Sequence, residues 1–333
     1  MVNKIVFEDQ IILYWDKEWE LSNDIVYVAT LNGDVQKCSK TTHVTFDGLL
    51  PSTEYPIKIE RVMSQDNVEI IYEEKVTTSP KRRRIDVTKP PYNAIFDGVT
   101  LTTNAIQKAI DDCKAGETVY IPKGTYLVGA LDLKSDIELY LDEDAVIQGT
   151  ADVKDYLPKI WSRFEGEELE CYRSLINVGK LDNKAGYTTK NVIIRGKGSI
   201  IGGGRELCEA VKQVETELLK EFLEKNKELV ATCERPDTIP KRRRGRLINI
   251  SNCQNVIMNG VKMGMGPAWN VHMVYSKDIV TCDCYIFSPG VSNGDGWDPD
   301  SSINCVCFNT EFATYDDGIA IKSGKNPEGK YHQ

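Results

Sequence analysis

A short pattern recurs along the chain: an Asn or Asp followed by a run rich in β-branched residues. It begins at Asp136, Asn191, Asn255, Asp278 and Asn304. The last three starts lie 23 and 26 residues apart (255 to 278, 278 to 304), with glycine-containing bends and no helical periodicity between them. Such a period is typical of a coil whose turns stack at the strand spacing of about 4.8 Å. The pattern predicts an all-β fold, a right-handed parallel β-helix.

The cysteines follow the same repeat. Cys305 occupies the position that Val256 and Ile279 occupy in their repeats, and it belongs to one of two C-x-C pairs, at 282–284 and 305–307. A zinc site is the alternative interpretation, but structural zinc sites usually space their cysteines C-x₂₋₄-C. We expect reduced thiols in the stack and no metal.

Three regions divide the chain. Residues 1–80 contain short β-rich runs, and the pattern Leu-x-Pro-x-Thr-x-Tyr ends at Tyr55. This pattern resembles the fibronectin type III module, in which the tyrosine makes a corner hydrogen bond, and Trp15 fits the core tryptophan. Residues 81–93, rich in cations and prolines, are expected to be a linker, and 94–333 to be the β-helix domain.

Two segments have helical rather than strand periodicity. Residues 103–113 carry apolar side chains at 106, 109, 110 and 113. Residues 206–230 do the same over a longer stretch, with lysines and glutamates elsewhere, which predicts an amphipathic helix inserted between two coils.

The bulk composition excludes several classes of protein. The net charge of −9 argues against a nucleic-acid partner, because phosphate binding favours a basic surface. No run of about 18 apolar residues predicts a membrane span. The N-terminus lacks the apolar core of a signal peptide, so we expect a cytoplasmic protein, or a secreted one if a leader has been removed. The oligomeric state stays open.

Three carboxylates stand about one coil apart. Asp295 follows Asn293 and Gly294, and Asp316 and Asp317 come 21 and 22 residues later. Crowded carboxylates do not all ionise easily, so one can act as a general acid while others deprotonate a water. Aspartates also cap turns, and Asp298 and Asp300 fit that simpler role. The chemistry needs no metal or cofactor.

Residues from about 85 to 333 resemble the polygalacturonases of glycoside hydrolase family 28. Asn293-Gly294-Asp295 is similar to the family's N-T-D segment, and residues 315–324 are similar to its G-D-D-x-I-A-I-K-S-G segment. The resemblance implies an inverting hydrolase of pectin, with Asp316 as general acid and with Asp295 and Asp317 activating the water. Residues 293–301 and 325–329 look most like the exo-acting bacterial branch, whose members also carry fibronectin-like modules.

The resemblance implies a set of substrate-binding residues as well. We expect Asn293, Lys322 and His272 to contact sugar, with Lys322 pairing a galacturonate carboxylate. Trp269 and Trp297 are expected to pack against sugar rings, although core packing is an equal alternative for Trp297. The basic run 241–246 is either part of a basic cleft or, more simply, a solvated loop.

The family's later G-H-G and R-I-K motifs have no counterpart here, so we expect a chain that is truncated at its C-terminus and weakly active. The function expected is exo-type hydrolysis of α-1,4-galacturonosyl linkages in oligo- or polygalacturonate. The alternatives are a hydrolase of the related polymer rhamnogalacturonan, a pectate lyase, and a non-catalytic carbohydrate-binding β-helix.

Overall fold

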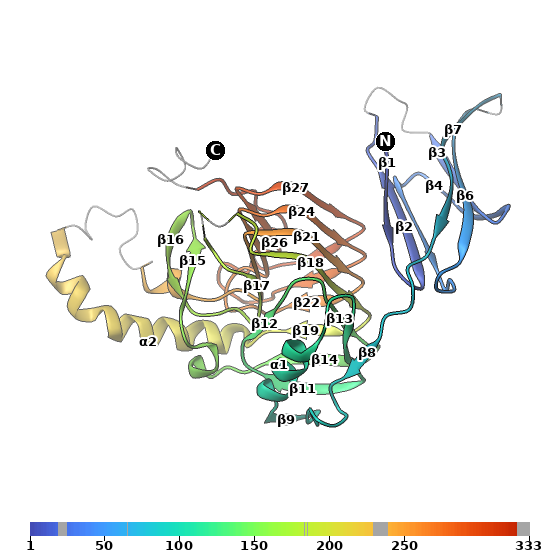
Figure 1. Cartoon of the computed structure of the whole chain (residues 1–333). Coiled ribbons are helices and arrows are strands. Elements are labelled where there is room, and N and C mark those ends of the chain that lie inside the picture. The colour runs from blue at the N-terminus through green and yellow to red at the C-terminus, as the bar shows by residue number, and fades with distance from the viewer. Residues whose placement is uncertain (19–24, 65, 183, 185, 229–238, 325–333) are drawn as a thin grey trace. The chain divides into compact units, whose positions relative to one another are not determined.

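The computed structural model describes residues 1–18, 25–64, 66–182, 184, 186–228 and 239–324. The chain divides into two compact units, 1–83 and 84–333, drawn in Figure 1. Among the described residues, no helix combines the length and apolar character needed to cross a membrane.

The first unit is a sandwich of two antiparallel sheets. One sheet has the order β1-β2-β5 and the other the order β4-β3-β6-β7. Their bounds are β1 Val2–Val6, β2 Gln10–Trp15, β3 Val26–Leu31, β4 Asp34–Ser39, β5 His43–Asp47, β6 Glu54–Ser64 and β7 Asn67–Thr77. Trp15 is buried between the sheets, and the backbone N–H of Leu50 donates to the Tyr55 hydroxyl at 2.9 Å, so this tyrosine fixes the turn that precedes its strand.

The second unit is a parallel β-helix with three sheets, and its coils stack on one another in Figure 1. The first sheet contains β8 Arg84–Asp86, β10 Thr118–Ile121, β13 Glu138–Leu141, β18 Thr189–Gly196, β21 Cys253–Asn259, β24 Lys277–Cys282 and β27 Ile303–Phe308. The second contains β9 Asp97–Leu101, β11 Gly124–Val128, β14 Ala145–Gly149, β19 Ser199–Ile201, β22 Lys262–Gly264, β25 Tyr285–Phe287 and β28 Glu311–Ala313. The third contains β12 Leu131–Leu133, β17 Ile176–Gly179, β20 Ile248–Ser251, β23 Val271–Val274 and β26 Trp297–Asp300.

Part of the range expected to be a linker is built into the β-helix. Strand β8, within 81–93, pairs with β10 in parallel, and Ile85 and Val87 are buried in the core of the second unit. The two buried residues alternate with polar neighbours, as a half-buried strand requires. This short signal lies beside a run of cations that is typical of a linker.

The recurring Asn or Asp has a structural reason. Each of the five residues has a positive φ, between 53° and 64°, a conformation that Asn and Asp tolerate better than other non-glycine residues. Their side chains also form a ladder: the amide of Asn191 donates to Asp136 at 2.7 Å, and that of Asn255 donates to Asn191 at 2.8 Å. The repeat therefore marks a bend near the start of five of the seven strands of the first sheet, from β13 to β27.

The expected register of the cysteine stack is confirmed. Val192 pairs with Val256, Val256 with Ile279, and Ile279 with Cys305. Cys282 and Cys284 are buried, and burial raises the pKa of the Cys282 thiol to about 12. These thiols therefore stay protonated and act as small apolar groups in the stack.

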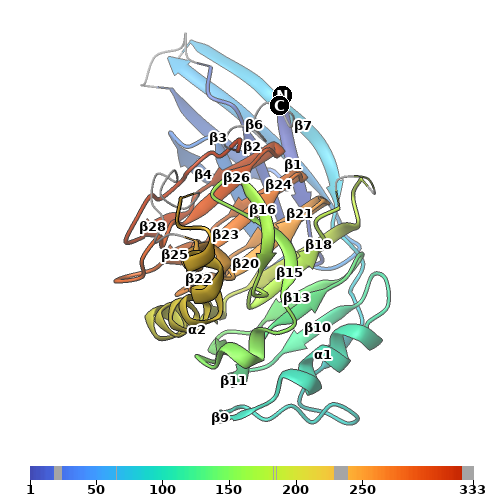
Figure 2. The ribbon, with the colours of Figure 1, turned by 90° about the vertical axis from the view of Figure 1, so that its left-hand side faces the viewer.

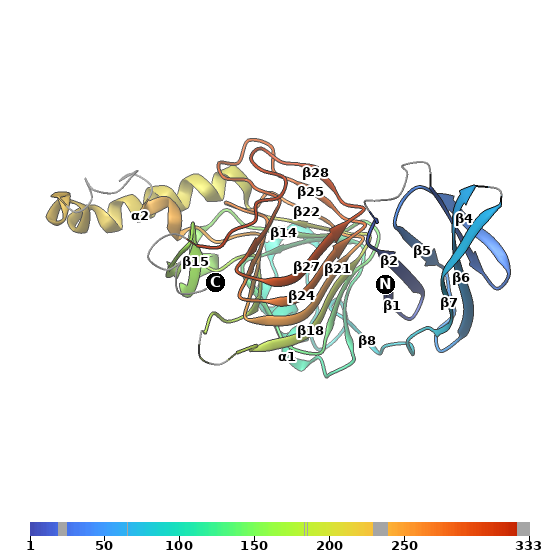
Figure 3. The ribbon, with the colours of Figure 1, turned by 90° about the horizontal axis from the view of Figure 1, so that it is seen from above.

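Both expected helices form. Helix α1, Thr103–Asp112, buries Ile106, Ala109 and Ile110 against the first coils. Helix α2, Gly204–Lys225, is the predicted insertion and extends away from the coils in Figure 3; the expected residues 229 and 230 lie outside the described ranges. Two short 3₁₀ helices, η1 at Val153–Tyr156 and η3 at Pro240–Arg243, pack near it.

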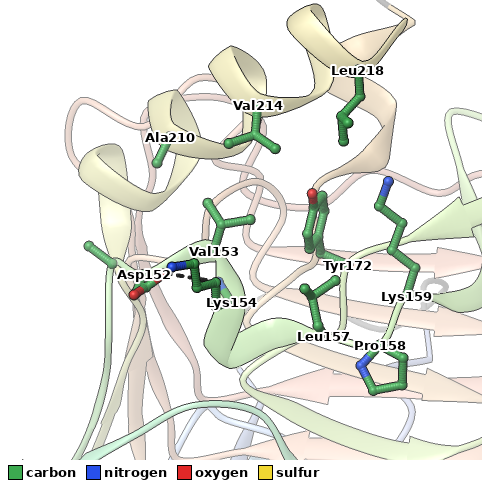
Figure 4. A pocket seen from close by; sticks show the side chains of 11 residues that line it. Asp152, Val153, Lys154, Leu157, Pro158, Lys159, Tyr172, Ala210, Val214 and Leu218 are labelled. Atoms are coloured by element: carbon green, nitrogen blue, oxygen red, sulfur yellow. Dashed lines mark hydrogen bonds between the residues drawn. The ribbon is translucent and has the colours of Figure 1, made fainter.

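The middle of α2 is anchored by a buried carboxylate. Glu215 is 1% exposed and receives hydrogen bonds from Lys159 at 2.5 Å and from the Tyr172 hydroxyl at 2.9 Å. Beside this contact lies an apolar hollow of about 970 Å³ between α2 and the η1 loop, with Val214 and Leu218 along its helical side (Figure 4).

Replacing Gly196 with Ala should destabilise the β-helix. Gly196 has φ +125°, and a Cβ there would lie 1.9 Å from the carbonyl oxygen of Leu141. Strain and clash together should lower the free energy of unfolding by about 3 kcal/mol or more. Gly116→Ala is the matched control, because Gly116 has φ +82° with nothing within 4 Å of the added Cβ. Denaturant unfolding that gave both variants equal losses would contradict this account.

Candidate active site

The outward face of the third sheet holds the polar residues of interest. In β26, Trp297 points into the core and its indole N–H donates to Thr281 Oγ1 at 2.9 Å. Asp298 and Asp300 alternate with it and therefore face the other side. The expected sugar contact of Trp297 is corrected: the side chain is 4% exposed and belongs to the packed interior.

Asp295, Asp298 and Lys322 form what we call the acid cluster. The Lys322 ammonium lies 3.1 Å from Asp295 Oδ2 and 3.0 Å from Asp298 Oδ1. Asp298 is fully buried, Asp295 is 5% exposed, and Lys322 also lies 4.3 Å from the centre of the Trp269 ring. Lys322 therefore holds two carboxylates of its own chain, and its expected pairing with a substrate carboxylate stays a prediction.

Burial sets the ionisation of the two cluster carboxylates. Desolvation raises the pKa of Asp298 to about 8, against the opposing attraction of Lys322. It also raises the pKa of Asp295, again opposed by Lys322 and reinforced by the nearby charge of Asp316. At neutral pH Asp298 therefore favours its protonated form, which leaves more of the Lys322 charge to stabilise an ionised Asp295.

Asp316 and Asp317 lie on the next coil, beside Asp295. The backbone N–H of Gly296 donates to the carbonyl of Asp317 at 2.9 Å, and a parallel bridge joins Trp297 to Ile319. Both aspartates are exposed, and the influence of Asp316 on Asp295 places it within electrostatic reach of the cluster. The structure thus brings Asp295 and the Asp316–Asp317 pair to the same region, as the repeat spacing predicts.

Three arginines that lie behind the acid cluster are among the largest fully buried side chains: Arg163, Arg244 and Arg246. Arg244 donates to Asn293 Oδ1 at 2.7 Å and to the Ser292 carbonyl at 2.8 Å, which fixes the loop that leads into Asp295. Asn293 therefore anchors this loop through its side-chain oxygen, and its expected contact with sugar stays a prediction. The interpretation of 241–246 as a solvated loop is wrong for Arg244 and Arg246.

A hairpin of β15 Ile160–Phe164 and β16 Glu167–Cys171 covers this face of the third sheet, and Figure 2 shows it in front of β20 and β23. Arg163 Nε lies 3.0 Å from Asp300 Oδ2. Phe164 stacks on Trp269 with ring centres 4.5 Å apart, so Trp269 is covered by the hairpin and is only 4% exposed. The expected packing of a sugar ring on Trp269 is contradicted, because Phe164 covers the indole ring.

His272 is fully enclosed. Its Nδ1 accepts a hydrogen bond from Arg246 Nε at 3.3 Å, and its Nε2 lies 3.5 Å from Asp300 Oδ2. Burial lowers the pKa of His272 to about 4, so the ring is neutral at physiological pH, with its proton on Nε2. The expected role of His272 as a direct sugar ligand is therefore replaced by a structural link between Arg246 and Asp300.

Sequence reasoning missed Asp298, Asp300 and the three arginines as parts of the site. The alternation Trp297-Asp298-Pro299-Asp300 carried a usable signal, since it places both carboxylates on one face of a strand. Segment 325–329, which supported the resemblance to the exo-acting branch, lies outside the described residues. No group of three or more His, Cys, Asp or Glu suited to hold a metal ion is present in the described part of the chain.

Replacing Asp298 with Asn should change how stability depends on pH. The pKa of Asp298 is raised to about 8 in the folded chain, above its value of about 4 when unfolded. Its stabilising contribution is therefore complete below about pH 4 and is lost as the pH rises through 8. The variant should gain a few kcal/mol relative to wild type between pH 4 and pH 8, measured by denaturant unfolding. Parallel curves for the two proteins would contradict the raised pKa.

Known proteins resemble the chain along most of its length. Residues 90–154 match a family model described as rhamnogalacturonase A/epimerase, pectate lyase-like. An exo-poly-alpha-D-galacturonosidase of Dickeya chrysanthemi is 30% identical over 304 residues, which are 85% of this chain and 49% of that protein. A probable polygalacturonase of Vitis vinifera is 29% identical over 72% of this chain and 44% of its own length. The chain thus spans about half the length of these relatives.

Solved structures share the fold. The family 28 exopolygalacturonase of Yersinia enterocolitica superposes with a TM-score of 0.83 at 23% identity, over 99% of this chain and 66% of that one. A hyperthermoactive exopolygalacturonase of Thermotoga maritima gives 0.61 at 29% identity, over 75% of this chain and 56% of that one. In its β-helix, its aspartate motifs and these matches, the chain is similar to polygalacturonases, including exopolygalacturonases of glycoside hydrolase family 28.

Proposed function

We propose that the chain is an inverting glycoside hydrolase that cleaves α-1,4-galacturonosyl linkages of oligo- or polygalacturonate from a chain end. The observation that carries the proposal is the acid cluster: two buried carboxylates share Lys322 and lie beside the exposed Asp316–Asp317 pair. Its relatives named exo-poly-alpha-D-galacturonosidase and polygalacturonase support the choice of substrate.

The proposed roles are those that the resemblance to the polygalacturonases implies for these three carboxylates. Asp316, exposed and next to Asp295, is the general acid whose proton passes to the leaving glycosidic oxygen. Asp295 and Asp317 take the proton of a water as its oxygen forms the new bond to the anomeric carbon on the opposite face. Asp295 Oδ1 has no hydrogen-bond partner among the described residues, which leaves its acceptor capacity unused.

The cations Lys322 and Arg244 hold the proposed catalytic carboxylates in place. Lys322 counters the raised pKa of Asp295, and Arg244 holds the loop that presents it. Both cations are engaged by groups of the chain itself, which supports a role in positioning the reacting carboxylates.

We also propose that the first unit is a fibronectin type III module. The support is its sheet order of three and four antiparallel strands, its buried Trp15 and the hydrogen bond at Tyr55. The module acts as a packing or spacing element, because it contributes no residue to the acid cluster.

Reducing-end release from trigalacturonate tests the proposed reaction directly. Hydrolysis should proceed in the presence of a chelator and produce no unsaturated sugar absorbing in the ultraviolet. A product with that absorbance, formed only with Ca²⁺, would identify a pectate lyase instead. Binding without any bond cleavage would identify a non-catalytic carbohydrate-binding protein, and preferential release from rhamnogalacturonan would change the polymer but keep the chemistry.

A further inference from the structure

A polar cavity lies on the outward face of the third sheet, on coils that precede the acid cluster. It has a volume of about 840 Å³, and Asn177 and Asn249 line it. The pairing register places Asn177 beside Asn249, Asn249 beside His272, and His272 beside Asp298. The cavity is therefore aligned with the acid cluster along the stack but lies on earlier coils.

The β15–β16 hairpin separates the cavity from the acid cluster. Ile160 and Trp161 of β15 line the cavity. Later in the same strand, Arg163 pairs with Asp300 and Phe164 stacks on Trp269. Strand β15 thus forms a wall of the cavity and also covers the buried arginines behind the acid cluster. A ligand bound in the cavity is therefore separated from the carboxylates proposed to cleave the substrate.

The charged residues of the cavity are mostly cationic. Lys134, Arg173 and Lys180 line it together with a single carboxylate, Asp132. Arg173 Nη2 lies 2.5 Å from Asp132 Oδ2, which neutralises that carboxylate. Lys134 donates to the carbonyl oxygen of Asp111 at 2.5 Å. Beside the hydrogen bond from Lys108, the charge of Lys134 also helps to lower the pKa of Asp112. A concave cationic surface on a chain with a net charge of −9 favours an anionic ligand.

An aromatic surface stands at the edge of this cavity. The Trp161 side chain is 52% exposed, and its indole N–H donates to Glu168 Oε2 at 3.2 Å. The other oxygen of Glu168 accepts from the Tyr275 hydroxyl at 3.0 Å, so the ring is held by a carboxylate that is itself fixed. A rigid, half-exposed indole offers an apolar face for the C–H face of a sugar ring.

We propose that this cavity is a second binding site for an acidic oligosaccharide, a uronate chain, distinct from the acid cluster. Carboxylates of the saccharide meet Lys134 and Lys180, a sugar ring packs on Trp161, and hydroxyls reach the amide of Asn249. The choice of uronate rests on the proposed function; the presence of an anionic saccharide site rests on the cavity alone. Such a site would retain the protein on the polymer while a chain end reacts elsewhere.

Mobility of the chain in gels that contain polygalacturonate tests the site, alongside hydrolysis of digalacturonate, which is too short to occupy both places. Trp161→Ala and Lys180→Glu should each weaken polygalacturonate binding about fivefold or more, an effect of roughly 1 kcal/mol by the usual conversion. Hydrolysis of digalacturonate should stay within about twofold of wild type. Lys262→Glu, the same charge change at an exposed position of the second sheet, is the matched control, and gels with neutral amylose control for charge.

The outcomes separate the two proposals. Retardation that is unchanged in both variants, with digalacturonate hydrolysis intact, overturns the second site and leaves the proposed function standing. Loss of retardation in both variants, but not in Lys262→Glu, supports the second site even if no hydrolysis is detected. Equal loss in Lys180→Glu and Lys262→Glu, with Trp161→Ala unchanged, shows only a general charge effect and overturns the site. Melting temperatures verify that each variant is folded.

Discussion

Replacing Asp316 with Asn should reduce the release of reducing ends from trigalacturonate by about a thousandfold, within the range that general acid catalysis contributes. Asparagine keeps the shape of the side chain but cannot give a proton to the leaving oxygen. Because Asp316 is exposed and its side chain accepts a hydrogen bond from the neighbouring N–H of Asp317 at 3.1 Å, the fold should be unaffected. Thermal unfolding of the variant should match wild type.

Asp144→Asn is the control for this substitution. Asp144 is an exposed carboxylate paired with Lys123 at 2.8 Å, at a coil bend before β14. It should keep full activity. If Asp316→Asn retained more than about a tenth of the wild-type rate, Asp316 would not be the general acid.

Replacing Lys322 with Met should shift the pH–rate profile and lower stability together. Lys322 favours the ionised forms of Asp295 and Asp298, so without it both pKa values rise further. Asp295 then ionises only at higher pH, and the acidic side of the rate profile should move upward by about one pH unit or more. At neutral pH the rate should fall about tenfold or more.

The loss of stability in this variant should depend on Asp298. A buried carboxylate left without its cation costs a few kcal/mol, less to the extent that it protonates. The double variant Lys322→Met/Asp298→Asn should therefore recover much of the loss above about pH 8, where Asp298 of the folded chain ionises, and Lys322→Arg should restore part of the rate. An unshifted acidic limb in Lys322→Met would show that Lys322 does not tune Asp295.

The β-helix could be predicted because its signal is local and repeated. Each coil needs one bend with positive φ, and the chain meets that need with Asn or Asp at 136, 191, 255, 278 and 304. The same bend sets the register, so the position of Cys305 beside Ile279 followed from counting residues. The proximity of Asp295 to Asp316 followed in the same way.

The burial of the arginines and of His272 behind the acid cluster could not be predicted from residue spacing. Arg244 and Arg246 lie in a run of cations that is typical of a solvated loop, and their burial depends on Phe164, about 80 residues away, which both guanidinium groups face. For Trp297 the sequence left two alternatives, sugar contact and core packing. The structure shows core packing, because the side chain points inward from β26. His272 was misassigned because nothing local shows that Arg246 and Asp300 enclose it.

The anomeric form of the first sugar released from trigalacturonate, followed by proton NMR during the first minutes of reaction, tests the central claim most directly. Hydrolysis at the acid cluster with a water activated by Asp295 and Asp317 predicts that the α-linkage yields a β-configured reducing end before mutarotation. A product that first forms in the α configuration, or an unsaturated product, would contradict the proposed roles of these carboxylates.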